Sequence, residues 1–339
     1  MGQRIYFCHH CNKSEKESAE FPLEQENLEN KISQSGSGEN AYLKSHLLKI
    51  IFLQKKVRSY LKNKKLKEDQ IDQKFKSILT SDNFIKSNAY ISQLIQEIDN
   101  KFAESKDIKE VKLQDKIKYK GEILKNKKHG YGIQIWPDGT IYRGEWKDDN
   151  ANGKGILIHS NGDKFFGEFI NEKAYGYCVY IHKNGVIYEG RWVNDLQEGH
   201  GKETWPDMSI YEGEFSKGLR DGKGKYVSNN NTFYEGEWLK GKINGYGIYK
   251  WNDGRTYEGN WKENCMNGYG CYKWIDGRKY EGEYQMDKKH GLGKYFWADG
   301  RIYEGRWDNG KQHGEGCIID SNGSKRKGIW EDGQRLKWI

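Results

Sequence analysis

The chain has 339 residues, of which 31% are charged, and its mean hydropathy is −1.03. This composition is too polar for one large buried core, yet aromatic residues reach 14%, which excludes the makeup of a disordered chain. The net charge is +8, but residues 119–339 carry nearly equal numbers of basic and acidic side chains, so we expect no nucleic-acid partner.

Residues 1–40 are polar, include Ser35-Gly36-Ser37-Gly38, and are predicted to form a disordered tail. Cys8 and Cys11 flank two histidines and look like half of a zinc site. A second ligand pair does not follow nearby, so we expect no metal and no other cofactor. The six cysteines are scattered and no secretory or transmembrane run is present, which predicts a cytoplasmic setting.

Residues 41–118 are predicted to be helical, and their first part is strongly basic. From residue 41 to residue 67 there are nine Lys or Arg and no Asp or Glu, with apolar residues among them. The segment at about 47–66 resembles an IQ motif, which implies binding of calmodulin or a related EF-hand light chain. The residues that carry the resemblance are Leu53, Gln54, Val57, Arg58, Tyr60, Leu61, Lys64 and Lys65. Two other interpretations stay open: a solvated basic helix packed on the rest of the chain, or a helix at an anionic membrane surface.

Residues 84–103 form a second predicted helix, with one apolar stripe and a cap at Ser81 or Asp82. The stripe has to be buried, and we expect it to pack over an apolar patch in the first three repeats of the C-terminal region. That patch is Ile133, Ile135, Ile156, Ile158, Val179 and Ile181. In repeats four to eight lysine recurs at the equivalent positions, as at Lys202, Lys225, Lys250, Lys273 and Lys294. The alternative is that the patch docks a different chain.

A repeat of 23 residues fills the C-terminal two thirds of the sequence. The triplet aromatic-x-Gly occurs nine times at intervals of 23 residues, from Tyr119 to Tyr303, without insertion or deletion. Each period also carries a large residue four positions later, a Gly-x-Gly in most cases, and in many repeats a Trp followed by Asp-Gly or Asn-Gly. A tenth start at Arg326 keeps only Gly328 and Trp330, which indicates a partial cap.

Tyr, Gly and Trp alternate with the period of a β-strand, so they share one face of each strand. Asp-Gly and Asn-Gly predict hairpin turns, and the strand glycines leave room for aromatic rings. We therefore predict a mainly β fold: an elongated single-layer antiparallel sheet of stacked 23-residue β-hairpins, preceded by an α-helical segment. The predicted aromatic face is formed by Tyr188, Trp192, Trp205, Tyr211, Tyr234, Trp238, Trp251, Tyr257, Trp261, Trp274, Tyr280, Trp297, Tyr303 and Trp307.

Tyr-Glu-Gly-Glu-Trp with these glycine spacings resembles the MORN repeat family, over residues 119–339. The third and fifth repeats depart most, with Cys178 in place of Gly and Asn230-Asn231 in place of Asp-Gly. The resemblance implies nine hairpin repeats and roles in ciliary axonemes, radial spokes and the cytoskeleton.

We find no catalytic constellation and predict that the chain is not an enzyme. The Gly-x-Gly pairs lack a following Lys-Ser/Thr and are interpreted as turn glycines rather than a phosphate loop. His129, His290 and His313 each precede such a pair and are interpreted as single turn residues.

The predicted function is a scaffold that docks other proteins of a large cytoskeletal assembly, such as a ciliary axoneme, and binds a calmodulin-like protein. The alternative is a peripheral membrane module that binds acidic phospholipids through the repeats and the basic helix 44–67. Loops of mixed charge argue against that alternative, which needs a one-sided basic surface. A filament that self-associates through its edge strands is a third hypothesis.

Overall fold

The computed structural model describes residues 69–105, 107–113 and 116–339. In this part of the chain three helices precede 21 strands, and all the strands belong to one antiparallel sheet. The predicted fold class, a mainly β protein of hairpin repeats after a helical segment, is confirmed. The chain divides into two compact units, and β10 (Ile210–Ser216) contributes residues to both.

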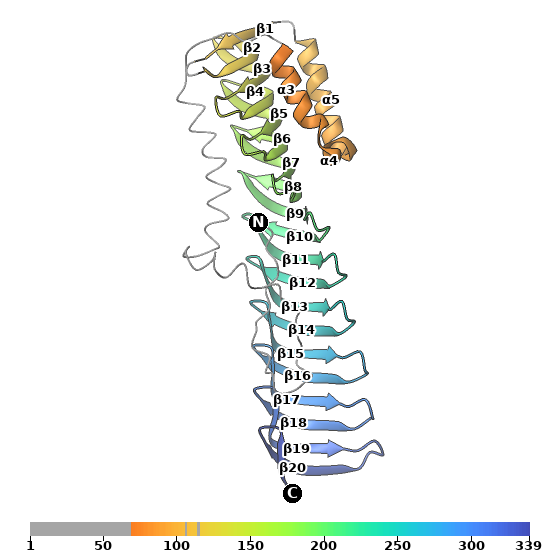
Figure 1. Ribbon diagram of the computed structural model, residues 1–339. Coiled ribbons are helices and arrows are strands. Elements are labelled where there is room, and N and C mark those ends of the chain that lie inside the picture. The colour runs from red at the N-terminus through yellow and green to blue at the C-terminus, as the bar shows by residue number, and fades with distance from the viewer. Residues whose placement is uncertain (1–68, 106, 114–115) are drawn as a thin grey trace. The chain divides into compact units, whose positions relative to one another are not determined.

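The first unit holds the helices and the strands that precede β10 (Figure 1). Its helices are α3 (Asp69–Thr80), α4 (Asn83–Ser87) and α5 (Ala89–Glu104). Its strands are β1 (Ile108–Lys112), β2 (Lys118–Leu124), β3 (Lys127–Ile135), β4 (Ile141–Lys147), β5 (Asn150–Ile158), β6 (Lys164–Ile170), β7 (Lys173–Ile181), β8 (Ile187–Val193) and β9 (Leu196–Thr204). Each strand pairs with the next along the chain.

The helical region differs from the prediction in three ways. The single helix predicted over 84–103 is two helices, because Asn88 is extended and its side chain accepts the backbone N–H of Ile91 as the cap of α5. Asp82 caps α4, as expected, by accepting the N–H groups of Phe84 and Ile85. Helix α3 lies within the predicted helical segment 41–118 but was not predicted as a separate helix, and β1 lies in the same segment, where helix was predicted. The predicted tail, the IQ-like residues, Cys8 and Cys11 lie outside the described residues.

The second unit consists of strands that follow β10. They are β11 (Leu219–Val227), β12 (Phe233–Leu239), β13 (Lys242–Lys250), β14 (Thr256–Lys262), β15 (Cys265–Lys273), β16 (Lys279–Gln285), β17 (Lys288–Phe296), β18 (Ile302–Asp308), β19 (Lys311–Ile319), β20 (Lys325–Glu331) and β21 (Gln334–Trp338). Within this unit too, consecutive strands pair in antiparallel fashion.

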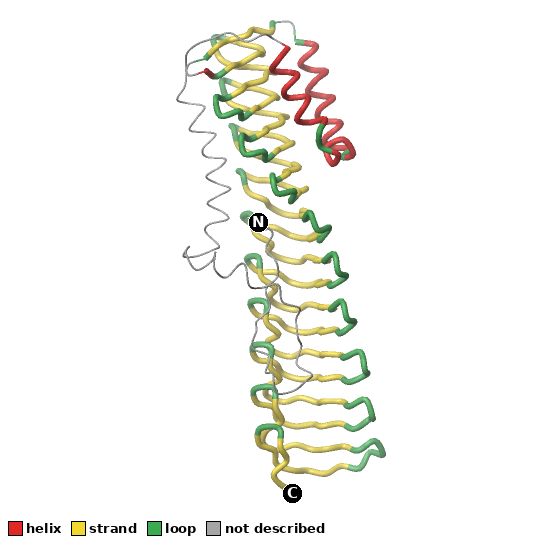
Figure 2. Tube along the Cα trace, in the orientation of Figure 1, coloured by secondary structure: helices red, strands yellow, loops and turns green. Residues whose placement is uncertain are grey.

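Two kinds of turn alternate along the strands, and they are drawn as loops in Figure 2. One is the predicted Asp-Gly turn, as at Gly254, whose φ is +94° and whose N–H donates to the carbonyl of Trp251. The other, not predicted, is a two-residue connection in which both residues have positive φ, as at Glu263-Asn264 with φ of 49° and 70°. Positive φ at both positions is the geometry that suits the twist of a two-residue hairpin.

The Gly-x-Gly pairs are strand residues, so their interpretation as turn glycines was wrong. In β13, Gly245 has a φ of +80° and sits where the pairing with β12 shifts between Gly236 and Trp238. This is a β-bulge, which bends the strand locally. His129, His290 and His313 likewise lie in β3, β17 and β19 rather than in turns.

Candidate protein-docking surfaces

The aromatic residues of the repeats form the core of the sheet. Of the fourteen residues in the predicted aromatic face, all but Trp274 and Trp297 are buried, and those two are partly exposed. Trp238 lies edge to face between Tyr211 and Tyr234, with ring centroids 5.1 and 5.4 Å apart. Its indole N–H donates to the carbonyl of Gly224, 3.2 Å away. Because the rings are enclosed in this way, they stabilise the fold and offer little surface to a partner.

The strand glycines are required by these rings. A Cβ on Gly247 would lie 2.6 Å from Cε2 of Tyr234, whose hydroxyl donates to the carbonyl of Glu237. The tyrosine ring therefore lies flat over the glycine backbone, as the sequence predicted. Burial raises the pKa of these tyrosines; for Tyr303 it reaches about 12. Their hydroxyls thus stay protonated and can donate.

Two aspartates in the two-residue turns have perturbed pKa values for a structural reason. Burial raises the pKa of Asp195 and that of Asp287 to about 6. Each carboxylate accepts a backbone N–H from the preceding hairpin: Asp195 from Ala174 and Asp287 from Met266, both at 2.7 Å. These carboxylates tie one repeat to the one before it.

The face of the sheet opposite the rings is called here the outer face. In the first unit α3, α4 and α5 cover it and bury the apolar patch of Ile133, Ile156, Ile158, Val179 and Ile181 together with Phe75, Leu79, Ile85, Ile91, Leu94 and Ile98. Ile135 is partly buried at the edge of this cluster. The patch is thus occupied by the chain's own helices, which leaves it unavailable to a second chain.

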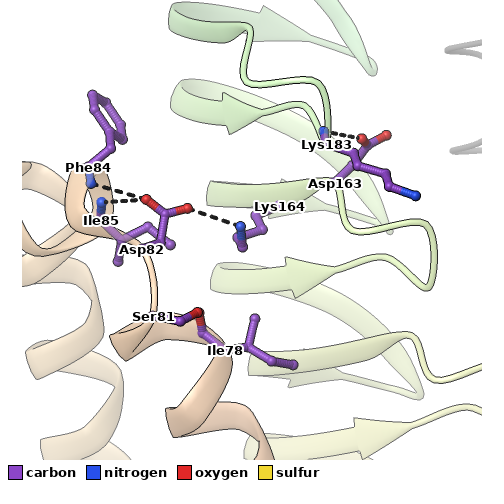
Figure 3. A network of polar contacts seen from close by, with 8 residues as sticks. All are labelled: Ile78, Ser81, Asp82, Phe84, Ile85, Asp163, Lys164 and Lys183. Carbon is purple, nitrogen blue, oxygen red and sulfur yellow. Dashed lines mark hydrogen bonds and ion pairs between the residues drawn. The ribbon is translucent and has the colours of Figure 1, made fainter. Parts of the chain in front are cut away.

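Ion pairs fix the helices on this face. The carboxylate of Asp99 lies 2.6 Å from the buried guanidinium of Arg143, and that of Glu97 lies 2.7 Å from Lys154 Nζ. Asp82 lies 3.0 Å from Lys164 Nζ while it caps α4, as Figure 3 shows. The helices carry acidic residues where the sheet carries basic ones.

The outer face of the second unit is exposed along β13, β15 and β17. We call Tyr246, Tyr269 and Leu292 the outer row; their exposed fractions are 49%, 61% and 59%. Asn260 and Glu283 lie between them on β14 and β16, opposite Tyr246 and Tyr269 respectively. Beside the row lie Ile248, Glu258, Cys271, Glu281 and Lys294. Glu258 accepts a hydrogen bond of 2.7 Å from the hydroxyl of Tyr246.

This row was not predicted from the sequence, because the prediction of the outer face rested only on the positions of Ile133 and Ile135 in each repeat. The middle residue of each Gly-x-Gly points to the same face, and its identity in β13, β15 and β17 was the available signal. Among the described residues, no three His, Cys, Asp or Glu side chains are grouped so that they could hold a metal ion. Of the helices in that part of the chain, none has the length and apolar character needed to cross a membrane.

The hairpins repeat in register around the buried aromatic rings of the sheet, which we call the aromatic ladder. This arrangement defines a β-hairpin repeat protein. A family model, the MORN repeat, matches eight segments that together make up more than half of the chain, so the chain belongs to the MORN repeat family. The matched residues are 119–141, 142–164, 188–207, 211–233, 234–254, 257–277, 280–300 and 303–325. The third repeat, which contains Cys178, is not among them. The MORN repeat is a non-enzymatic repeat module that serves binding and scaffold roles.

Several solved structures resemble the chain at low identity. The wild-type TCP10 domain of CPAP from Danio rerio is 11% identical, with a TM-score of 0.32, over 61% of this chain and 92% of that one. The TCP domain of SAS-4 from Drosophila melanogaster, solved with a proline-rich motif of Ana2, is 14% identical, with a TM-score of 0.31, over 52% and 90%. TM-scores below 0.5 say nothing about what this chain binds. No curated protein matches the sequence.

Proposed function

We propose that this protein is a structural scaffold that docks partner proteins in a cytoskeletal assembly, and that the assembly is a ciliary axoneme. Its surfaces support docking: the outer face holds amphipathic helices in the first unit, while the same face in the second unit exposes Tyr246, Tyr269 and Leu292. Exposed aromatic residues on a rigid sheet are typical of protein contacts. The axoneme follows from the family resemblance.

The test is extraction of the tagged full-length protein from a ciliated cell. We expect it to stay with axonemes after detergent treatment and to leave them at high salt. Release by detergent alone would contradict the cytoskeletal role. A variant with Tyr246→Ser and Tyr269→Ser tests whether the second unit holds the protein there, since both side chains are exposed and their loss leaves the aromatic ladder intact.

A calmodulin or EF-hand light chain is the proposed partner of the IQ-like segment. The supporting observation is the pattern of Leu53, Val57, Tyr60 and Leu61 among basic residues, which suits an acidic groove lined with methionine. Pull-down of the full chain with calmodulin, with and without Ca²⁺, tests this. We expect Leu53→Asp to abolish capture and the exposed-site change Ile275→Ser to leave it unchanged.

Binding of acidic phospholipids is the second candidate, favoured by the basic segment 44–67. The outer face of the second unit argues against it, because lysines there pair with glutamates: Lys225 with Glu235, and Lys294 with Glu304. Co-sedimentation with phosphatidylserine vesicles separates the two candidates. The scaffold proposal expects the protein to stay in the supernatant at physiological salt.

A further inference from the structure

Helix α5 is in register with the repeats that it covers. Tyr90 contacts Tyr177 in the third repeat, and Glu97, seven residues later, pairs with Lys154 one repeat earlier. Seven helical residues rise about 10.5 Å, and two strands of a sheet span about 9.5 Å. A helix that crosses the strands therefore presents one heptad to each repeat, and the outer face can hold such a helix at any set of repeats with suitable side chains.

The outer row lies five periods of 23 residues after the residues beneath α5. By this offset Leu292 corresponds to Tyr177, Tyr269 to Lys154, and Tyr246 to Tyr131. Ile248 likewise corresponds to Ile133. The same set of positions therefore recurs in the second unit. Ile248 is 39% exposed where Ile133 is 1% exposed, whereas Tyr246 and Tyr177 are equally exposed, at 49%.

The charges of the two platforms differ at the positions that α5 uses. Arg143, which pairs with Asp99 of α5, corresponds to Glu258, and Lys154, which pairs with Glu97, corresponds to Tyr269. Three glutamates, Glu258, Glu281 and Glu283, lie in or beside the outer row together with Lys294, and Glu281 pairs with Lys279 at 2.7 Å. Lys250 and Lys273 lie farther along the same face, so the charge reversal relative to the α5 platform is local to Glu258. A helix with the charges of α5 would place a carboxylate against Glu258, which is unfavourable.

We propose that the outer face of β13–β17 docks an amphipathic helix of a partner protein, with apolar residues every seven positions against the outer row and a basic residue against Glu258. The proposal rests on the scaffold function and names the class of partner. The recognition is by shape and charge: one apolar or aromatic side chain for each of Tyr246, Tyr269 and Leu292, and an ion pair with Glu258 where α5 has Asp99. The occupant is another protein, because residues 41–67 are the proposed site of a calmodulin-type partner and α5 of a second copy would bring Asp99 against Glu258.

The experiment uses the full chain and two synthetic peptides held helical by a staple on the solvent side. Both contain the α5 sequence 89–104 with Glu97→Leu, and the basic peptide also carries Asp99→Arg. Fluorescence anisotropy should show that the basic peptide binds at least tenfold more tightly than the one that keeps Asp99. Tyr269→Ser should weaken binding of the basic peptide at least tenfold. Ile275→Ser, an equally exposed change in a turn, should change it less than twofold.

A charge exchange keeps the test independent of folding defects. In Glu258→Lys the preference should reverse, so that the peptide with Asp99 binds more tightly than the basic one. Equal affinity of the two peptides for both proteins would overturn the proposal, and so would basic-peptide binding that is insensitive to Tyr269→Ser.

The occupant is identified with a photo-crosslinking residue at position 269 of the full chain. Crosslinks to the basic peptide support the proposal. Crosslinks to residues 41–67 of the same chain, or to a second copy, would overturn it in favour of those occupants. These outcomes are separate from retention on axonemes. If the protein stays with axonemes but binds neither peptide, only the proposed helix site is disproved. If it binds the basic peptide but is released from axonemes by detergent, only the proposed cytoskeletal assembly is disproved.

Discussion

The hydroxyl of Tyr90 in α5 donates a hydrogen bond of 2.9 Å to the backbone carbonyl of Tyr177 in β7, and the two rings meet edge to face at 5.0 Å. Tyr177 is the middle residue of a strand's Gly-x-Cys, the third repeat's version of Gly-x-Gly. The contact therefore links α5 to the outward-facing position of the third repeat, where Tyr177 remains 49% exposed. It lies at the edge of the buried cluster between the helices and the sheet, and it shows how a MORN sheet holds a helix.

Truncation of Ile91 should release α5 from the sheet. Its side chain is fully buried in the cluster between α5 and the outer face, so Ile91→Ala is expected to cost about 2–4 kcal/mol. The measurement is hydrogen exchange of the α5 amides, which should become faster while exchange in β12–β18 stays the same. Gln93→Ala, at an exposed position of the same helix, is the control. Unchanged α5 protection in Ile91→Ala would contradict this account of the docking.

Loss of the Asp99 charge should also loosen the helix. Asp99→Asn removes the carboxylate beside a guanidinium that is 5% exposed and stacks on Phe75 and Phe102. Because the carboxylate itself is 36% exposed, we expect about 1–3 kcal/mol rather than the larger cost of a fully buried pair. A double-mutant cycle with Arg143→Met measures the coupling by urea denaturation. Additive effects of the two changes would show that the pair contributes nothing.

A methyl group on a strand glycine should disturb the aromatic ladder. In Gly270→Ala the new Cβ would lie 2.6 Å from Cε2 of Tyr257, a ring with no exposed surface. The ring cannot move without breaking its contact with Trp261, so we expect a loss of about 2–3 kcal/mol in the free energy of unfolding. The comparison is Gly277→Asn in the next turn, where a Cβ meets nothing within 4 Å and Asn tolerates the φ of +87°. Equal thermal stability of the two variants would show that the ring does not require the glycine.

Much of this fold is predictable because the repeat is strict. Alternation of Tyr, Gly and Trp gives the strands and the buried face, and the glycines under Tyr234 and Tyr257 follow from the same pattern. The break at Asn88 was not predictable from periodicity, because the apolar stripe continues through it, and only its capping chemistry marks it. Strand β1 depends on pairing with β2, which is a tertiary effect on a sequence with helical character.

The surfaces were less predictable than the core. The sequence predicted a helix over the apolar patch of the first three repeats, where the structure places α3, α4 and α5. The exposed row of the second unit was not predicted. The outer row was missed because only the positions of Ile133 and Ile135 were compared between repeats, although the pleat places Tyr246 and Tyr269 on that same face, opposite Tyr234 and Tyr257. The alternation of a strand decides the face of a side chain, and residue type alone does not.

Replacement of Asp287 by Asn should stabilise the protein at neutral pH. The carboxylate accepts the N–H of Met266, and Asn264 does the same for Ile243 one repeat earlier, also at 2.7 Å, so an amide oxygen fits this position. Asp287→Asn should therefore keep the hydrogen bond and remove a buried charge. Asp195 occupies the equivalent place in the first unit.

The stabilisation should depend on pH with a definite sign. Burial raises the pKa of Asp287 from 3.8 to about 6, so below pH 3.8 the group is protonated in both the folded and the unfolded state. Between pH 4 and 6 the folded protein holds the proton and the unfolded chain has lost it, so the free energy of unfolding falls as pH rises through this window. Urea denaturation of both proteins at pH 4, 5, 6 and 7 should show the advantage of Asp287→Asn growing to about 1–3 kcal/mol at pH 7. A difference between the two proteins that stays constant over this range would mean that the Asp287 carboxyl has an ordinary pKa in the folded state.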